Sequence, residues 1–203
     1  RWTATDAAEL YDVARWGKGY FSVAPNGHLL VHPTKDGSRA LDLKQLVDRL
    51  QLRGIDLPIL IRFAGILKHR LGEIHDAFAA AIAEHKYTGQ YCCVYPIKVN
   101  QQRQVVEEVL RFGKPFHFGV EAGSKPELLA VVAMTDNETP IICNGFKDAE
   151  FIDLGLYARQ MGISCFFVLE SVTELPLVIE RSRALNVEPL IGVRIKNSVV
   201  VDG

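Results

Sequence analysis

One lysine at the end of an apolar run is the first residue in this sequence that could do chemistry. The run "YCCVYPIKVNQ", residues 91–101, has the composition of a buried strand, and its only charged residue is Lys98. Burying an unpaired ammonium costs on the order of several kcal/mol. Lys98 therefore either extends into solvent or is kept at the strand end because its amine has a chemical function. A lysine that is partly shielded from water can attack a carbonyl group with its neutral amine.

Strand alternation places Lys98 on the same face as Val94 and Pro96. If that face points into a closed sheet, we expect the amine to be walled off from bulk water. The ordinary alternative is a strand-end lysine whose alkyl stem lies on the protein while its ammonium stays in solvent.

Other polar side chains end neighbouring apolar runs in the same way. They are Arg62, Glu121, Asn144, Glu170 and Arg194. The carboxyl ends of parallel strands face the same direction, so we expect these side chains and Lys98 to crowd around one mouth, where α/β proteins place their sites. We expect three further polar residues at the same mouth: Asn100, His117 and Ser124.

Short apolar runs alternate with helical segments through most of the chain. The expected strands are 57–62, 91–98, 116–121, 140–145, 164–170 and 188–195, and the expected helices between them are 67–86, 101–113, 124–134, 148–162 and 172–186. This alternation predicts an α/β fold with a parallel sheet covered by helices on its outside. The repeat length suits a (β/α)8 barrel of the triosephosphate isomerase type, with about six βα units present.

The first part of the chain follows a different pattern. Residues 1–16 have helical periodicity, residues 19–33 predict a hairpin with a Pro-Asn-Gly turn, and residues 41–54 predict an amphipathic helix. We therefore expect residues 1–40 to contribute to a second, β-rich domain and residues 41–203 to form the first part of the barrel. A closed barrel needs eight units, so we expect a larger protein, and the tail "NSVVVDG", residues 197–203, has no predicted place.

Composition excludes several classes of protein. A net charge of −1 gives no electrostatic basis for binding nucleic acid or an anionic membrane surface. The apolar runs are too short to span a bilayer and no signal peptide is evident, which favours a cytoplasmic protein. The cysteines form no C-x-x-C pair, so we expect reduced core residues at positions Cys92, Cys93, Cys143 and Cys165.

Two motifs resemble those of a known family. "YPIKVNQ", residues 95–101, resembles the pyridoxal-phosphate lysine motif of the alanine-racemase-like, or fold type III, enzymes. "GVEAGSKPEL", residues 119–128, resembles the acidic-residue and Ser-Lys-x-Glu motif of the decarboxylases within that family. Three longer segments, residues 9–33, 61–78 and 87–113, resemble the branch that acts on arginine, and the similarity extends over residues 2–195.

The resemblance implies a role for three residues. Lys98 falls on the lysine that carries pyridoxal 5'-phosphate as a Schiff base, Glu121 on an acidic residue beside the cofactor, and Arg194 on a basic residue near its ring. Without the resemblance, Glu121 is equally well a solvated carboxylate at the start of a helix. Arg194 is then an ion-pair partner for Glu121 or Glu170.

The implied activity is decarboxylation of L-arginine to agmatine and carbon dioxide, the first step towards putrescine and spermidine. The resemblance also implies a Mg²⁺ requirement and a homo-oligomer, dimer or tetramer. In the family, the glycine-rich phosphate-binding segment, the acidic partner of the pyridine nitrogen, and a cysteine and aspartate from a partner subunit follow later in the chain. We therefore expect residues 1–203 alone to have no measurable decarboxylase activity.

Several alternatives share these motifs. One is a non-catalytic pyridoxal-phosphate carrier of the same barrel fold, which lacks the N-terminal helix and hairpin. Others are a decarboxylase of the same fold acting on ornithine, lysine or diaminopimelate, and a racemase, which needs a tyrosine from a second domain. The last is a barrel-like binding module whose Lys98 simply extends into solvent.

Overall fold

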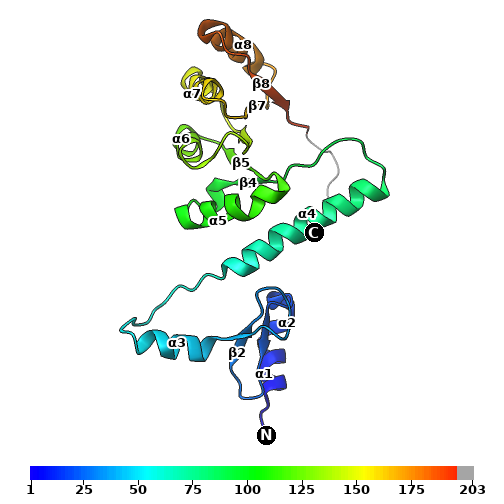
Figure 1. The fold of residues 1–203 in the computed structure, drawn as a ribbon, viewed down its shortest axis with the longest axis vertical. Helices are drawn as coiled ribbons and strands as arrows, with labels where there is room; N and C mark the ends of the chain where they lie inside the picture. Colours follow the sequence, from blue (N-terminus) through cyan, green and yellow to red (C-terminus); the bar gives the residue numbers. More distant parts are fainter. Residues whose placement is uncertain (196–203) are drawn as a thin grey trace. The chain divides into compact units, whose positions relative to one another are not determined.

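A computed structural model of the protein describes residues 1–195. The chain divides into two compact units, residues 1–73 and the residues from Ile74 onward (Figure 1). The boundary falls within one long helix, α4 (Ala64–Glu84). Within the described residues, no helix is both long enough and apolar enough to cross a lipid bilayer.

The first unit begins with two short helices where the sequence predicted one. Helix α1 (Ala4–Leu10) starts with a capping box, in which the Thr3 hydroxyl accepts from the Asp6 N–H and the Asp6 carboxylate accepts from the Thr3 N–H. Asp12 then adopts a left-handed backbone conformation, with φ of 50°, and α2 (Val13–Gly17) follows. The prediction of one continuous helix over residues 1–16 is wrong, because a left-handed residue interrupts the helical hydrogen bonds.

The predicted hairpin is present and belongs to a small antiparallel sheet. Strands β1 (Phe21–Val23) and β2 (Leu29–Val31) pair with each other, and β2 also pairs with β3 (Leu41–Asp42). Asp42 caps α3 (Leu43–Gln51) by accepting from the Gln45 N–H at 3.0 Å.

A polar cluster joins the first residues of α4 to this unit. The buried Tyr20 hydroxyl lies 2.7 Å from His69 Nδ1 and donates to Glu73 Oε2 at 3.1 Å. Glu73 also pairs with Lys35 and Arg70. Hydrogen bonding from Lys35 is the main reason that the pKa of Glu73 falls from 4.5 to about 2.

The second unit contains a five-stranded parallel sheet with the order β4-β5-β6-β7-β8. The strands are β4 (Val94–Pro96), β5 (Gly119–Ala122), β6 (Ile141–Cys143), β7 (Cys165–Leu169) and β8 (Leu190–Val193). The helices that connect them are α5 (Arg103–Gly113), α6 (Lys125–Met134), α7 (Ala149–Gln160) and α8 (Glu174–Leu185). Helices α5 to α8 lie on one side of the strands (Figure 1), as expected for part of an α/β barrel.

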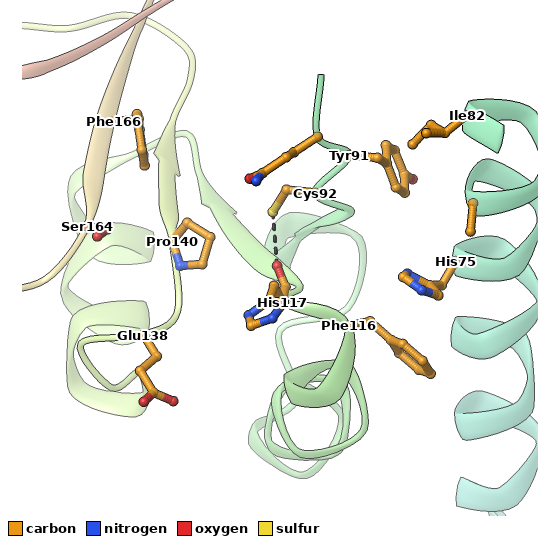
Figure 2. Close-up of a pocket in the computed structure, with 12 residues that line it drawn as sticks. His75, Ile82, Tyr91, Cys92, Phe116, His117, Glu138, Pro140, Ser164 and Phe166 are labelled. Carbon is orange, nitrogen blue, oxygen red and sulfur yellow. Dashed lines mark hydrogen bonds between the residues drawn. The ribbon is translucent and has the colours of Figure 1, made fainter. Parts of the chain in front are cut away.

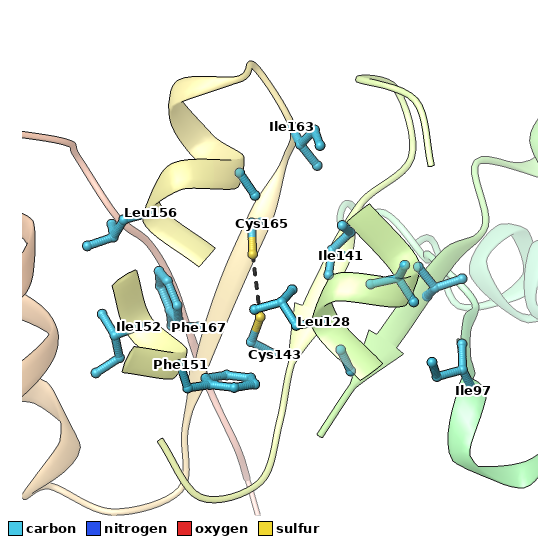
Figure 3. Packing of buried hydrophobic residues seen from close by; sticks show 14 of the residues in the cluster. Ile97, Leu128, Ile141, Cys143, Phe151, Ile152, Leu156, Ile163, Cys165 and Phe167 are labelled. Atoms are coloured by element: carbon cyan, nitrogen blue, oxygen red, sulfur yellow. Dashed lines mark hydrogen bonds between the residues drawn. The ribbon is translucent and has the colours of Figure 1, made fainter. Parts of the chain in front are cut away.

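The main hydrophobic core lies between the sheet and these helices (Figure 3). Alternate strand residues supply it, including Val120 of β5, Ile141 of β6 and Phe167 of β7. Residues between them, such as Glu121 and Ile142, point to the other face and are neighbours in the register. The alternation therefore sends one set of side chains into the helix-covered core and leaves the opposite face for the site.

One of the six expected strands does not form. Residues 57–62 belong to no sheet, with a bend at Leu57 and Pro58, and within them Leu60 is exposed. A strand exists only with a hydrogen-bonded neighbour, and Pro58 cannot donate a backbone hydrogen bond. Apolar composition alone therefore predicted a strand for which the described residues provide no pairing strand.

The cysteines fit the expectation only in part. All four thiols are free, and Cys143 and Cys165 are buried with their sulfur atoms 3.4 Å apart (Figure 3). Cys92, in contrast, is exposed and Cys93 is intermediate, so the prediction of a core position for Cys92 is wrong. The reason is that β4 begins only at Val94, and the residues before it are not part of the sheet. The tail that had no predicted place, residues 197–203, lies outside the described residues.

Candidate cofactor-binding site

A pocket of about 350 Å³ lies at the carboxyl ends of the parallel strands. It is lined by Lys98, Glu121, Gly123, Glu127, Asn144, Gly145, Glu170 and Arg194. Five of the six strand-end residues that the sequence singled out therefore line one pocket, as the parallel arrangement predicted. The sixth, Arg62, lies in the first unit, in the segment that forms no strand.

Lys98 faces Glu121 at one side of this pocket. Strand β4 ends at Pro96, and Lys98 lies in the short 3-10 helix Ile97–Val99 that follows it. Pro96 is the register partner of Glu121, so a residue just beyond the end of β4 can reach the Glu121 carboxylate. The Lys98 Nζ lies 3.6 Å from Glu121 Oε1.

The expected enclosure of Lys98 is wrong for the chain described. Its side chain is 63% exposed, whereas that of Glu121 is 15% exposed. The physical reason is that β4 is the edge strand of the five-stranded sheet, so a neighbouring strand covers Lys98 on one side only. The amine nevertheless lies among the strand ends and does not point away from them.

Arg194 and Glu170 form the other side of the pocket. Arg194 follows β8, and its Nη1 lies 3.2 Å from Glu170 Oε1, beyond the end of β7. The same carboxylate oxygen accepts the Gly145 N–H at 2.9 Å. This backbone hydrogen bond, followed by the positive charge of Arg194, holds the pKa of Glu170 below its ordinary value. The expected ion pair of Arg194 with Glu170 is therefore confirmed.

Glu127 of the Ser-Lys-x-Glu motif also lines the pocket, although the sequence predicted no role for it. Ser124 caps α6 by accepting from the Glu127 N–H at 3.4 Å. In return, Glu127 Oε2 accepts the Gly123 N–H at 2.7 Å. The S-x-x-E spacing of a capping box is the sequence signal that could have identified this residue. The cap therefore fixes Gly123 and Glu127, which both line the pocket.

Two residues that we expected at the carboxyl ends of the strands, His117 and Asn100, do not line the pocket. His117 precedes β5 and lies at the amino end of the strand, so the prediction that it lines the same mouth is wrong. Asn100 follows Lys98 but does not line the pocket; its side-chain oxygen accepts from the Gln102 N–H at 3.1 Å just before α5.

A larger pocket, of about 610 Å³, lies at the opposite ends of the strands (Figure 2). Its lining includes Tyr91, Phe116 and Phe166, together with His75 and His117. In Figure 2 the Cys92 thiol donates to the His117 carbonyl, a contact of 3.1 Å. Size alone favours this pocket, but sites in parallel α/β folds lie at the carboxyl ends of the strands, where the smaller pocket gathers five charged side chains. We therefore place the candidate site in the smaller pocket.

The smaller pocket combines a primary amine, a guanidinium and three carboxylates. An amine beside a carboxylate can bond to an aldehyde and exchange a proton with its neighbour. Pyridoxal phosphate carries an aldehyde on a pyridine ring, and the amine of Lys98 and the charges of Glu121 and Arg194 fit that part of the molecule. The fold and this pocket define a domain of the α/β barrel class with its site at the strand ends.

Comparison with known proteins supports the same class. Residues 71–200, more than half of the chain, match the family described as pyridoxal-dependent decarboxylase, pyridoxal binding domain. A biosynthetic arginine decarboxylase from Rhodopirellula baltica is 53% identical over 196 residues, covering 97% of this chain and 29% of that protein. One from Gloeobacter violaceus is 49% identical over 198 residues, covering 96% of this chain and 30% of that protein. The chain belongs to the pyridoxal-dependent decarboxylase family.

Two solved structures have a fold similar to that of this chain. The biosynthetic arginine decarboxylase from Campylobacter jejuni aligns with a TM-score of 0.78 and 32% identity, covering 90% of this chain and 30% of that one. A diaminopimelate decarboxylase from M. jannaschi aligns with a TM-score of 0.64 and 21% identity, over 91% of this chain and 38% of that one, and shares the fold. The α/β barrel-type fold predicted from the sequence is confirmed. The chain spans about 30% of the length of the relatives it matches.

Proposed function

We propose that the protein containing this chain decarboxylates L-arginine to agmatine and carbon dioxide with pyridoxal 5'-phosphate as cofactor. The observation that carries the chemistry is the Lys98–Glu121 pair, 3.6 Å apart, at the carboxyl ends of parallel strands. The choice of arginine is supported by relatives named biosynthetic arginine decarboxylase that are 53% and 49% identical to nearly all of this chain.

Lys98 is the proposed point of covalent attachment of the cofactor. Its exposed amine is accessible to an aldehyde entering the pocket, and its pairing with Glu121 holds Nζ beside a carboxylate. As an amine at the pocket beside a carboxylate, Lys98 could also carry a proton to or from a bound substrate. Glu121, mostly buried and negatively charged, holds the ammonium in place and compensates its charge.

Arg194 is the proposed cationic group near the cofactor ring. Glu170 fixes the guanidinium, and the Gly145 N–H fixes Glu170 in turn. When bound, pyridoxal phosphate supplies an electron sink for the electron pair left when carbon dioxide departs. Gly145, Glu170 and Arg194 hold one another in place, so they could orient a bound ring and substrate without rearranging first.

The resemblance implies further residues of the proposed site beyond those that the structure describes. Gly123 and Gly145 line the pocket as single glycines, and the resemblance places the phosphate-binding segment later in the chain. Among the described residues, no group of three or more His, Cys, Asp or Glu side chains is arranged to hold a metal ion. The Mg²⁺ requirement, the dimer or tetramer, the cytoplasmic location and the domain division at residue 40 stay predictions from the sequence.

The experiment uses the full-length gene product, loaded with pyridoxal phosphate, and follows carbon dioxide release from L-arginine, ornithine, lysine and diaminopimelate. We expect release from arginine, with agmatine as product, and its loss in Lys98→Ala and in Lys98→Arg, which keeps the charge but lacks a primary amine. Lys44→Ala is the matched control, since the Lys44 side chain is 60% exposed and lies outside the pocket. Binding of the cofactor without release from any amino acid would favour the carrier alternative. Release from another amino acid in preference to arginine would leave the chemistry intact and change the substrate.

A further inference from the structure

A buried lysine contacts the pocket residue Gly145 and has no part in the proposed chemistry. Lys147 is in the segment between β6 and α7, and its side chain is 0% exposed. An ammonium is costly to remove from water unless charged or hydrogen-bonding partners surround it. The groups that contact the Lys147 ammonium therefore indicate its structural role.

Lys147 connects the segments that lead into two helices. Its Nζ donates to the Gly145 carbonyl oxygen at 2.7 Å, in the segment before α7. It also lies 3.4 Å from both carboxylate oxygens of Glu174, the first residue of α8. Glu174 is itself 11% exposed and accepts the Glu170 N–H at 2.8 Å. The buried ion pair thus binds two backbone groups, the Gly145 carbonyl oxygen before α7 and the Glu170 N–H before α8.

Both of these backbone groups belong to residues that line the pocket. Gly145 is held from two sides, because Lys147 binds its carbonyl oxygen and the Glu170 carboxylate binds its N–H. Glu170 is likewise held through its backbone N–H by Glu174, while its carboxylate contacts Arg194. Lys147 and Glu174 do not line the pocket themselves.

We propose that Lys147 and Glu174 are positioning residues, which fix Gly145 and Glu170 and, through Glu170, set the guanidinium of Arg194. The proposal rests on the proposed function where it concerns the cofactor, but its geometric part does not. A pair of apolar side chains could fill the same space without the cost of burying charge. An apolar pair, however, could bind neither the Gly145 carbonyl oxygen nor the Glu170 N–H.

The test compares variants of the full-length gene product. Lys147→Met removes the ammonium and keeps most of the volume, and Glu174→Gln keeps an oxygen acceptor for the Glu170 N–H. The double variant Lys147→Met/Glu174→Leu replaces the whole pair with apolar side chains, which avoids a lone buried charge. Arg181→Met is the matched control. It removes a different ion pair between α8 and α7, with Asp153, whose two hydrogen bonds are both 2.8 Å and lie outside the pocket.

The first readout is amide hydrogen exchange without cofactor, followed at residues 144–147 and 170–174. The double variant removes the Glu174 oxygen that accepts the Glu170 N–H, so we expect it to accelerate exchange at Glu170 about tenfold or more. Lys147→Met removes only the donor to the Gly145 carbonyl oxygen, so we expect a smaller acceleration at Gly145 and Glu170 that arises from loosening of the two segments. The double variant should regain resistance to urea but not the protection from exchange at Glu170. Glu174→Gln should retain most of the protection at Glu170, and Arg181→Met should leave both segments within about twofold of wild type.

The second readout is the dissociation constant of pyridoxal phosphate, which should rise about tenfold in Lys147→Met and in the double variant but not in Arg181→Met. Unchanged exchange at Gly145 and Glu170 in the double variant would overturn the positioning role. Because the double variant has no lone buried charge, it tests the positioning role even if Lys147→Met does not fold. A wild-type protein that binds no pyridoxal phosphate would overturn the proposed function. The hydrogen-exchange result would still decide the geometric claim.

Discussion

Gly145 provides the sharpest prediction about the pocket wall. Its φ is +75°, and a Cβ at this position would lie 2.8 Å from the backbone oxygen of Gly123, which cannot rotate away. Gly145→Ala therefore has two costs. The left-handed backbone costs about 1–2 kcal/mol for an L-residue, and relieving the overlap adds about 1–3 kcal/mol. The sum is a loss of about 2–5 kcal/mol in the free energy of unfolding.

Gly162→Ala is a matched control at the other end of α7. Gly162 has φ of +87°, so it has the same backbone cost, but its added Cβ would meet the end of the Asn137 side chain at 3.2 Å. That side chain can rotate aside, so we expect a loss of only about 1–2 kcal/mol. Gly162 also lies outside the pocket, so its replacement should not change cofactor affinity.

The assay for both variants is urea unfolding of the full-length gene product followed by circular dichroism, with a titration of pyridoxal phosphate on the folded protein. Gly145→Ala should lose more stability than Gly162→Ala and should also bind the cofactor more weakly, because Gly123 and Gly145 must separate. Equal losses of stability in the two variants, with unchanged cofactor affinity in both, would refute the close approach of these two segments.

Two further predictions concern groups outside the pocket. The pKa of Glu73 falls from 4.5 to about 2 in the folded state, chiefly through Lys35, so its contribution to stability is present above pH 4.5 and is lost as the pH falls towards 2. Glu73→Gln should flatten the dependence of urea midpoint on pH over this range, and an unchanged slope would contradict the prediction. The thiol pKa of Cys143 lies well above its ordinary value because of the contact with Cys165 and burial. Iodoacetamide at pH 7 should therefore label exposed Cys92 well before Cys143 and Cys165, and equal labelling would show that the core is open.

The sequence predicted much of the second unit because its elements are locally encoded. Apolar runs such as those ending at Glu121 and Glu170 become strands since each has a neighbouring run to pair with, and the caps at Ser124 and Asp148 begin helices. The polar residues after the strands then converge on one pocket because parallel strands end at one edge.

Other features depend on contacts that no local pattern reports. Residues 57–62 have strand composition but pair with no strand among the described residues, and the left-handed Asp12 interrupts a helical periodicity that otherwise continues. The exposure of Lys98 depends on β4 being an edge strand, which is a property of the sheet order. The buried pair of Lys147 and Glu174 joins residues 27 positions apart and has no sequence signature of its own.

The most direct test of the central claim is to find which residue the cofactor binds covalently. The full-length gene product would be incubated with pyridoxal phosphate, reduced with borohydride to make the bond permanent, digested and examined by mass spectrometry. The structure predicts the pyridoxyl group on Lys98, in the peptide that spans β4 and the start of α5, and no such peptide from Lys98→Ala. A pyridoxyl group found on another lysine, with Lys98 unmodified, would contradict the account.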